Sequence, residues 1–126
     1  MLATRAWASP PTCSAGTIEA YTQANADLAE WDEKSHYPVD VWKAAGELGF
    51  GAIYVSEENG GIGLGRLDAA LIMEAMAYGC PATSAYISIH NMAAWMIDTF
   101  GSAELKARFL PELVSMDKIA SYCLTE

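Results

Sequence analysis

A glycine-rich stretch in the middle of the chain is one candidate for a phosphate-binding site. Residues 60–67 read Gly-Gly-Ile-Gly-Leu-Gly-Arg-Leu, and glycines let backbone amides approach a phosphate closely. A dinucleotide-binding fingerprint would have glycine at Arg66, and a P-loop would have lysine there, followed by Ser or Thr at Leu67. Because neither spacing fits, the stretch favours a structural turn over a phosphate cradle.

A polar pair inside an apolar stretch is the second candidate. His90 and Asn91 lie in the middle of residues 82–100, which are otherwise mostly apolar. Such a pair can line a ligand cavity, or it can be hydrogen-bonded within the core. The sequence leaves both alternatives open.

Nucleophilic and metal chemistry have no support in the spacing of the remaining residues. His36 and His90 show no spacing with the acidic residues that implies a shared catalytic site. Cys13, Cys80 and Cys123 form no CxxC pair and lie far from both histidines. We therefore predict no catalytic set, no metal site and no disulfide framework in this chain.

The composition limits the size of the fold and its partners. A chain of 126 residues supports one domain with a single core. Because 52% of the residues are hydrophobic and only 18% are charged, we expect part of the apolar surface to need a partner. The net charge of -9 argues against nucleic-acid binding and against binding to anionic membranes.

The first residues resemble a weak targeting segment. Residues 1–18 contain no acid, one arginine and several Ser and Thr, which is the bias of a mitochondrial transit peptide. A disordered start or an imperfect gene model is the alternative. Since Pro10, Pro11 and Gly16 disfavour regular structure, we expect residues 1–16 to be unstructured or transit-like.

Hydrophobic spacing predicts the helices that must position these residues. The first is expected at residues 17–31. The second is expected to follow Pro38, with Asp40 as its cap and Gly49 as its stop. Residues 52–55 form an apolar run too short to assign as a strand, and residues 60–65 are expected to be a loop.

Two long apolar segments come next. Residues 67–78 are apolar almost all round, so we expect a helix that is buried on most faces and ends at Gly79. Residues 82–100 predict a second helix, opened by Pro81 and closed by Gly101. The first segment is shorter than the roughly 20 residues that cross a bilayer, and the second carries polar residues, so a buried hairpin fits better than a membrane span.

The end of the chain predicts one more helix and the beginning of a sheet. Ser102 is expected to cap a helix from residue 103 to about residue 110, which Pro111 interrupts before residues 112–116. Residues 119–124 resemble the beginning of a strand, which needs a sheet to join. We predict an all-α domain that ends at the first strand of a missing β-domain.

Four stretches resemble the acyl-CoA dehydrogenase family in the same order and at the same separations. They are residues 29–38, 48–51, 60–64 and 120–126. Within the family, residues 85–92 and 94–98 most resemble the valine-pathway member, which acts on isobutyryl-CoA. Residues 1–18 match nothing in these relatives. The resemblance implies an all-helical amino-terminal domain at residues 17–118 and the start of the middle β-domain at residues 119–126.

The resemblance also implies a flavin and a substrate, with the general-base glutamate outside this chain. It places FAD against the segment Tyr122, Cys123, Leu124, Thr125 and Glu126. The Thr125 hydroxyl would bond the polar edge of the ring, where a donor stabilises the charge that arrives with a hydride. The acyl end of the thioester pocket would be shaped by Ser88, Met92 and Trp95, for which ordinary core packing is the alternative.

The remaining implications concern partners and location. Relatives act on acyl-CoA, form homotetramers and pass electrons to electron-transfer flavoprotein, and the expected location is the mitochondrial matrix, or the cytoplasm in a bacterium. A different class of function is a non-catalytic helical interaction module derived from the same domain.

Overall fold

The computed structural model describes residues 30, 31, 33–123 and 125. The predicted helix at residues 17–31 therefore lies outside the described residues except at its end, where residues 30 and 31 are helical. The later elements are α2 (Val39–Glu47), the short 3-10 helix η1 (Glu57–Asn59), α3 (Arg66–Gly79), α4 (Pro81–Phe100) and α5 (Ala103–Val114).

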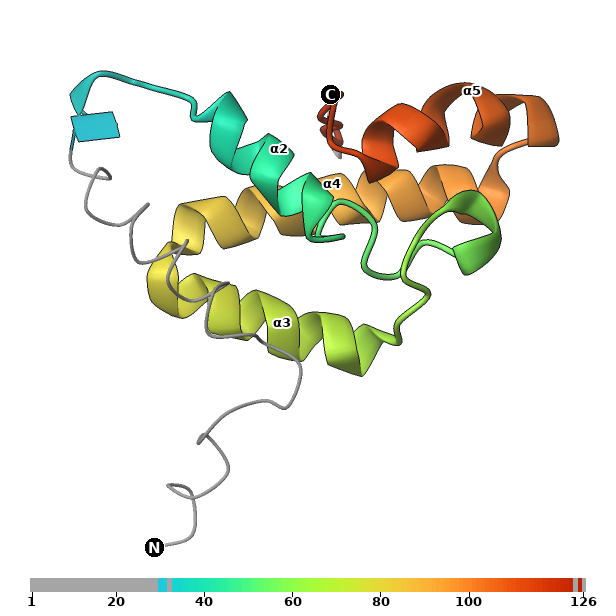
Figure 1. The fold of residues 1–126 in the computed structure, drawn as a ribbon, viewed down its shortest axis with the longest axis horizontal. Coiled ribbons are helices and arrows are strands. Elements are labelled where there is room, and N and C mark those ends of the chain that lie inside the picture. Colours follow the sequence, from blue (N-terminus) through green and yellow to red (C-terminus); the bar gives the residue numbers. More distant parts are fainter. Residues whose placement is uncertain (1–29, 32, 124, 126) are drawn as a thin grey trace, which may run out of the picture.

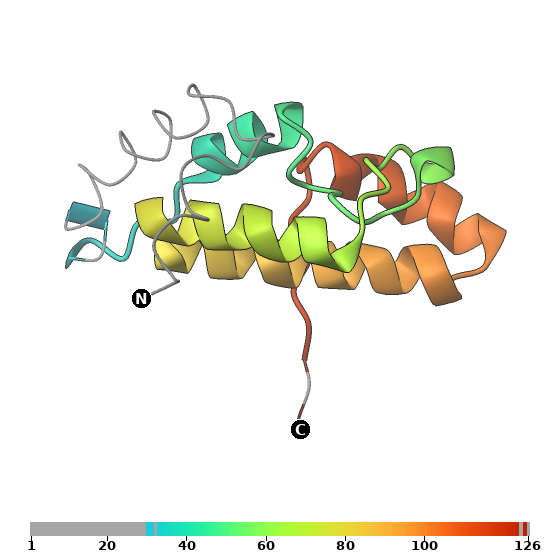
Figure 2. The ribbon, with the colours of Figure 1, turned by 90° about the horizontal axis from the view of Figure 1, so that it is seen from below.

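Helix α4 is the centre of the arrangement. It forms an antiparallel hairpin with α3, and α2 and α5 lie one after the other along α4, as a second layer on one side of the hairpin (Figure 1 and Figure 2). Figure 2 shows the same layers from below, with the segment after α5 running past the middle of α4 and projecting away from the helices. Each neighbour of α4 thus meets a different part of its surface.

Helix α2 confirms the predicted amphipathic helix and corrects its cap. Trp42 and Ala45 are buried, and Gly49 closes the helix in the left-handed region with φ of 85°. The helix begins at Val39 with Pro38 as its N-cap and no capping side chain. The prediction that Asp40 caps is wrong, because Asp40 lies inside the first turn, where it still complements the helix dipole.

The α3–α4 hairpin confirms both predicted long helices, but α3 is less buried than predicted. Helix α4 begins with Pro81, after Cys80, whose sulfur accepts a hydrogen bond from the Thr83 N–H. In α3 only Ala69 and Met76 are buried, and Leu67 is 73% exposed. The prediction that α3 is buried on most faces is wrong for the described residues, because only one of its sides packs on α4.

Helix α5 continues through its proline. Ser102 caps the helix as predicted, since its hydroxyl accepts from the Leu105 N–H. The predicted break at Pro111 is wrong, because α5 runs on to Val114. Proline removes one intrahelical hydrogen bond, and the burial of Leu110 and Leu113 on either side of it holds the helix against the core.

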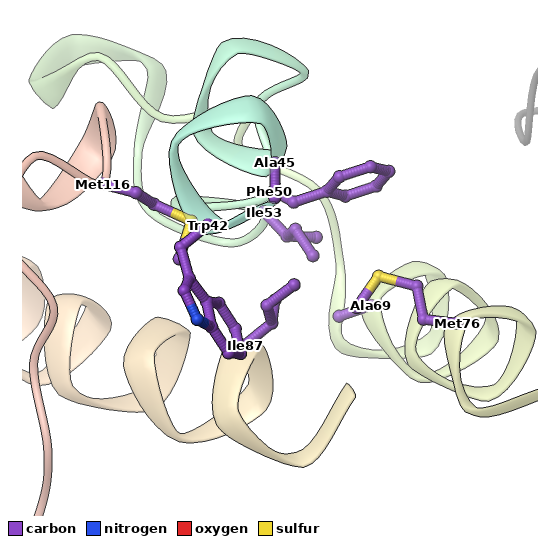
Figure 3. Packing of buried hydrophobic residues seen from close by; sticks show 8 residues of the cluster. All are labelled: Trp42, Ala45, Phe50, Ile53, Ala69, Met76, Ile87 and Met116. Carbon is purple, nitrogen blue, oxygen red and sulfur yellow. The ribbon is translucent and has the colours of Figure 1, made fainter. Parts of the chain in front are cut away.

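The buried apolar residues form two clusters. The first lies between α2, α3 and α4 and contains Trp42, Ala45, Phe50, Ile53, Ala69, Met76, Ile87 and Met116 (Figure 3). The second joins the segment after α2 to α4 and α5 through Ala52, Val55, Ala94, Leu110 and Leu113. Residues 52–55, which the sequence left unassigned, are therefore the buried connection between the two clusters.

The predicted strand at residues 119–124 does not form in the described part of the chain. Residues 119–123 have no regular secondary structure, and residue 124 lies outside the described residues. A strand is defined by hydrogen bonds to a neighbouring strand, and no strand is assigned among the described residues. No described helix is both long and apolar enough to cross a membrane.

Candidate functional site

The polar pair in the middle of α4 is hydrogen-bonded within the core. Asn91 is fully buried; its Oδ1 accepts from the Ile53 N–H at 2.7 Å, and its Nδ2 donates to the Phe50 carbonyl at 2.7 Å and to the Ile87 carbonyl at 2.9 Å. These bonds fasten the segment after α2 onto α4. Of the two alternatives that the sequence left open, the structure supports internal bonding for Asn91.

His90 connects α4 to the end of α5 and to the segment beyond it. Its ring is fully buried, with Nε2 at 2.9 Å from the Leu113 carbonyl and Nδ1 at 3.0 Å from the Ala120 N–H, which donates to it. Burial lowers the pKa of His90 below its ordinary value, although the backbone groups of Leu113 and Gly51 act in the other direction. His90 is therefore a neutral residue bonded within the core.

Asp98, near the carboxyl end of α4, also binds a loop segment to this helix through hydrogen bonds. Its carboxylate accepts from the Ser56 N–H and hydroxyl, both at 2.9 Å, and from the Asn59 side chain at 2.6 Å. Burial raises the pKa of Asp98, but these hydrogen bonds and the charge of Lys106 outweigh burial, so the pKa lies below its ordinary value. Asp98 is thus an ionised carboxylate whose hydrogen bonds hold η1 on α4.

The glycine-rich stretch forms a structural turn, as the sequence favours. Its backbone amides are used internally: Ile62, Gly63 and Leu64 donate to carbonyls of residues 52, 55 and 53 at 2.9 Å each. Gly63 lies in the left-handed region with φ of 70°. A phosphate cradle needs amides that point at an anion, and these three amides are already bonded to the backbone.

Arg66, directly after this turn, lies between two aromatic rings. Its guanidinium carbon is 4.2 Å from the centre of the Tyr54 ring and 4.1 Å from the centre of the Trp95 ring. Burial raises the pKa of Tyr54, although Arg66 acts in the opposite direction. Trp95 also meets Phe100 edge-on, with ring centres 5.7 Å apart. No local pattern in the sequence indicates this stack, because the three stacked residues lie on separate elements.

The predicted substrate-pocket residues lie on one side of α4. Ser88, Met92 and Trp95 are spaced by four and three residues, which places them on one face of the helix, and each is half-buried. Exposed apolar residues continue along the same helix at Tyr86, Ile89, Met96 and Phe100. Tyr86 and Phe100 lie on a different side of the helix, whereas Trp95 lies against Arg66 of α3. The side of α4 that carries Ser88, Met92 and Trp95 is therefore partly covered by α3.

The predicted flavin-contacting segment extends from the helical body. Tyr122 is half-buried, and Cys123 and Thr125 are exposed. Leu124 and Glu126 lie outside the described residues. The segment leaves the core at Ala120, which packs against the second cluster and donates to His90. Its point of exit thus lies beside the middle of α4, the helix that also carries the predicted substrate-pocket residues (Figure 2).

A pocket of about 370 Å³ lies at the other end of α4 and contains none of the predicted site residues. Its aromatic wall includes Tyr37, Trp42 and Tyr86; the Tyr37 and Trp42 rings stack, and Tyr86 meets both edge-on. The buried Trp42 Nε1 has no hydrogen-bond partner among the residues that the structure describes. Within the same residues, no group of three or more His, Cys, Asp or Glu could hold a metal.

Comparison with known proteins decides the family. The model of the acyl-CoA dehydrogenase amino-terminal domain matches residues 16–117. The chain belongs to the acyl-CoA dehydrogenase family. Its helical fold agrees with that domain, and the resemblance inferred from the four sequence stretches is confirmed.

Individual relatives refine this assignment. The chain is 56% identical over 99 residues to a mitochondrial isobutyryl-CoA dehydrogenase of Bos taurus, and 58% identical over 97 residues to one of Dictyostelium discoideum. A probable medium-chain specific acyl-CoA dehydrogenase of Caenorhabditis briggsae, also named mitochondrial, is 34% identical over 100 residues. These alignments cover 77–79% of this chain and 23–24% of the relatives, so the chain spans about a quarter of their length.

Proposed function

We propose that this chain is the amino-terminal part of an FAD-dependent acyl-CoA dehydrogenase that desaturates a short branched acyl-CoA, isobutyryl-CoA in valine breakdown. The observation that carries the proposal is the identity of 56–58% to two isobutyryl-CoA dehydrogenases, against 34% to the medium-chain relative. The helical domain would occupy residues 17–118, after an unstructured or transit-like start at residues 1–16. Residues 119–126 begin the β-domain.

The exit segment has the chemistry that a flavin wall needs. Thr125 offers an exposed hydroxyl and Tyr122 a half-buried ring. Bound FAD would supply the acceptor for the hydride that leaves the β-carbon of the thioester. In this chain, Tyr122, Cys123, Leu124, Thr125 and Glu126 would form one edge of the flavin site, with the Thr125 hydroxyl donating to the polar edge of the ring. A fixed donor in a dry site stabilises developing negative charge strongly.

The side of α4 that carries Ser88, Met92 and Trp95 would face the acyl group. Ser88, Met92 and Trp95 would shape the end of the pocket, and the Arg66 guanidinium between Tyr54 and Trp95 would fix the plane of the Trp95 ring. A ring held between neighbours can set the depth of a pocket. One methylene changes selectivity by only about 1 to 3 kcal/mol. Because a mobile wall could adjust to the extra methylene, selection of a branched four-carbon acyl group requires a wall that stays fixed.

The proposal extends to partners and location. Relatives named mitochondrial support a mitochondrial location, and within it we propose the matrix. On α3, Leu67 is 73% exposed and Tyr78 is 75% exposed. Later domains or other subunits of a homotetramer would cover these side chains. Electrons would pass to electron-transfer flavoprotein.

Substrate preference tests the proposal. A chimera in which the 99 aligned residues of this chain replace those of the bovine relative would be assayed by dye reduction with isobutyryl-CoA, 2-methylbutyryl-CoA and butyryl-CoA. We expect kcat/KM to be highest for isobutyryl-CoA. The matched control is the unmodified bovine protein assayed alongside. A chimera that prefers butyryl-CoA would contradict the isobutyryl assignment.

The second candidate is a helical interaction module without chemistry, favoured by the same exposed apolar residues on α3 and α4. The codons after Glu126 in the gene distinguish the two candidates. A frame that continues with Pro-Gly and further small residues supports the dehydrogenase, whereas a stop codon supports the module.

A further inference from the structure

The His90 ring ties the exit of the candidate flavin segment to the centre of the fold. It lies in the middle of α4, with its Nε2 at 2.9 Å from the Leu113 carbonyl at the end of α5 and its Nδ1 at 3.0 Å from the Ala120 nitrogen. The ring is fully buried. One side chain therefore fixes the end of α5 and the segment beyond it against the same helix.

The two partners select one tautomer of the ring. A carbonyl oxygen can only accept, so Nε2 carries the proton and donates to Leu113. The Ala120 N–H can only donate, so Nδ1 has a free lone pair. A proton at Nδ1 would face the Ala120 N–H and break this contact. The bond to Ala120 thus requires the neutral Nε2–H form.

This bond is the last one before the flavin-contacting residues. Lys118 is held by Glu112 through both its backbone and its side chain, and Ala120 is held by His90. Between Ala120 and Thr125, the described residues make no further hydrogen bond. Tyr122 lies two residues beyond the anchor, a distance of about 7 Å along an extended chain.

We propose that His90 is the positioning residue of the flavin-contacting segment: its bond to Ala120 sets where Tyr122 and Thr125 leave the helical domain. This inference rests on the proposed function of that segment. Because Thr125 would act on the ring through a hydroxyl whose position matters at the scale of about 1 Å, a fixed exit point determines whether that hydroxyl meets the ring.

Two substitutions separate positioning from stability. Asn carries an oxygen near the place of Nδ1, so His90→Asn keeps an acceptor for the Ala120 N–H and loses the donor to Leu113. Gln carries a nitrogen near the place of Nε2, so His90→Gln keeps the donor to Leu113 and loses the acceptor for Ala120. Each variant loses one buried hydrogen bond, so a merely structural role would affect both alike.

Hydrogen exchange of the Ala120 amide is the first measurement, made on the FAD-loaded chimera. We expect exchange in His90→Gln to be about tenfold faster than in His90→Asn, as the loss of one hydrogen bond predicts. We also expect the Kd for FAD to rise about tenfold in His90→Gln and to change less than about twofold in His90→Asn. Equal Ala120 exchange in the two variants would overturn the inference.

The FAD titration distinguishes this inference from the proposed function. If Ala120 exchange differs between the variants while the Kd for FAD stays unchanged in both, the anchor exists but the segment does not serve the flavin, which contradicts the proposed role of residues 122–126. If both quantities differ as expected, anchor and flavin role are supported together.

A measurement without any variant covers the case in which a substituted protein fails to fold. In the ¹⁵N-labelled 126-residue chain, a through-hydrogen-bond coupling between the Ala120 amide nitrogen and His90 Nδ1 is expected, with Nε2 protonated. A ring protonated at Nδ1, or a folded chain without this coupling, would overturn the anchor.

Discussion

Replacing Asn91 with alanine removes three side-chain hydrogen bonds from the middle of α4. The Ile53 N–H loses its acceptor inside the first cluster, and the Phe50 carbonyl loses a donor. The Ile87 carbonyl keeps the Asn91 backbone N–H in the helix ladder, so the loss there is small. An unsatisfied buried donor costs about 1 to 3 kcal/mol, and a lost bond about 1 kcal/mol. We therefore expect the free energy of unfolding to fall by about 2 to 4 kcal/mol.

Such a loss is large for a domain of this size. Folded domains are stable by about 5 to 15 kcal/mol, and the free energy falls by about 1 to 3 kcal/mol per molar urea. The urea midpoint, measured by circular dichroism, should therefore drop by roughly 1 to 2 M. Hydrogen exchange should locate the change at Ile53.

The control for this experiment lies on the same helix. Thr99 is exposed on α4, so Thr99→Ala should change the free energy of unfolding by less than about 0.5 kcal/mol. An Asn91→Ala variant that loses under about 1 kcal/mol, or a Thr99→Ala variant that loses as much, would refute the reasoning that Asn91 fastens residues 50–53 onto α4.

Three further predictions concern Asp98, the glycine turn and Thr125. Because folding lowers the pKa of Asp98, the ionised carboxylate stabilises the fold above its ordinary pKa, and this stabilisation is lost as pH falls through the folded value. The difference in free energy of unfolding between wild type and Asp98→Asn, measured with urea, should therefore shrink below about pH 4. A difference that widens on acidification would contradict this. A Cβ at Gly61 would lie 2.2 Å from the Val55 carbonyl oxygen, whereas at Gly65, whose φ is -72°, the nearest atom is a side-chain oxygen of Asp68 at 3.2 Å. Gly61→Ala should therefore destabilise the fold by about 1 to 3 kcal/mol and by more than Gly65→Ala, and equal losses would contradict the close packing of Gly61 on Val55. In the FAD-loaded chimera, Thr125→Val should slow stopped-flow bleaching of the flavin more than it weakens thioester binding, and an unchanged rate would remove Thr125 from the site.

The helices were predictable because local signals agree with the packing. Ala45 recurs on the apolar face of α2, Gly49 supplies the left-handed stop, and Ser102 caps α5. These signals act within a few residues, so the sequence carries them directly. The positions of α2, α4 and the start of α5 were accordingly predicted within a few residues.

The errors arise where tertiary contacts override a local rule. Pro111 should end a helix, but buried Leu110 and Leu113 hold α5 together on both sides of it. Leu67 should be buried by its type, but the described chain offers no element to cover it. Neither outcome is determined by residues nearby in the sequence.

The candidate site was only partly predictable for the same reason. The sequence marked His90 and Asn91 as unusual, but their roles depend on Phe50, Ile53 and Ala120, which are 30 or more residues away. The stack of Arg66 on Trp95 also joins separate elements. The predicted flavin and acyl residues came from family resemblance, and their roles stay predictions.

We propose that this chain supplies one wall of a flavin site, which domains outside it would complete. The most direct measurement is the visible spectrum, recorded anaerobically with FAD before and after isobutyryl-CoA is added, for the 126-residue chain and for the chimera. We expect the chain alone to stay colourless and inactive after free FAD is removed, because an enclosed cofactor loses most of its contacts without the other walls. We expect the chimera to be yellow and to bleach with the thioester. A yellow and active chain alone, or a folded chimera that binds no FAD, would contradict the proposal.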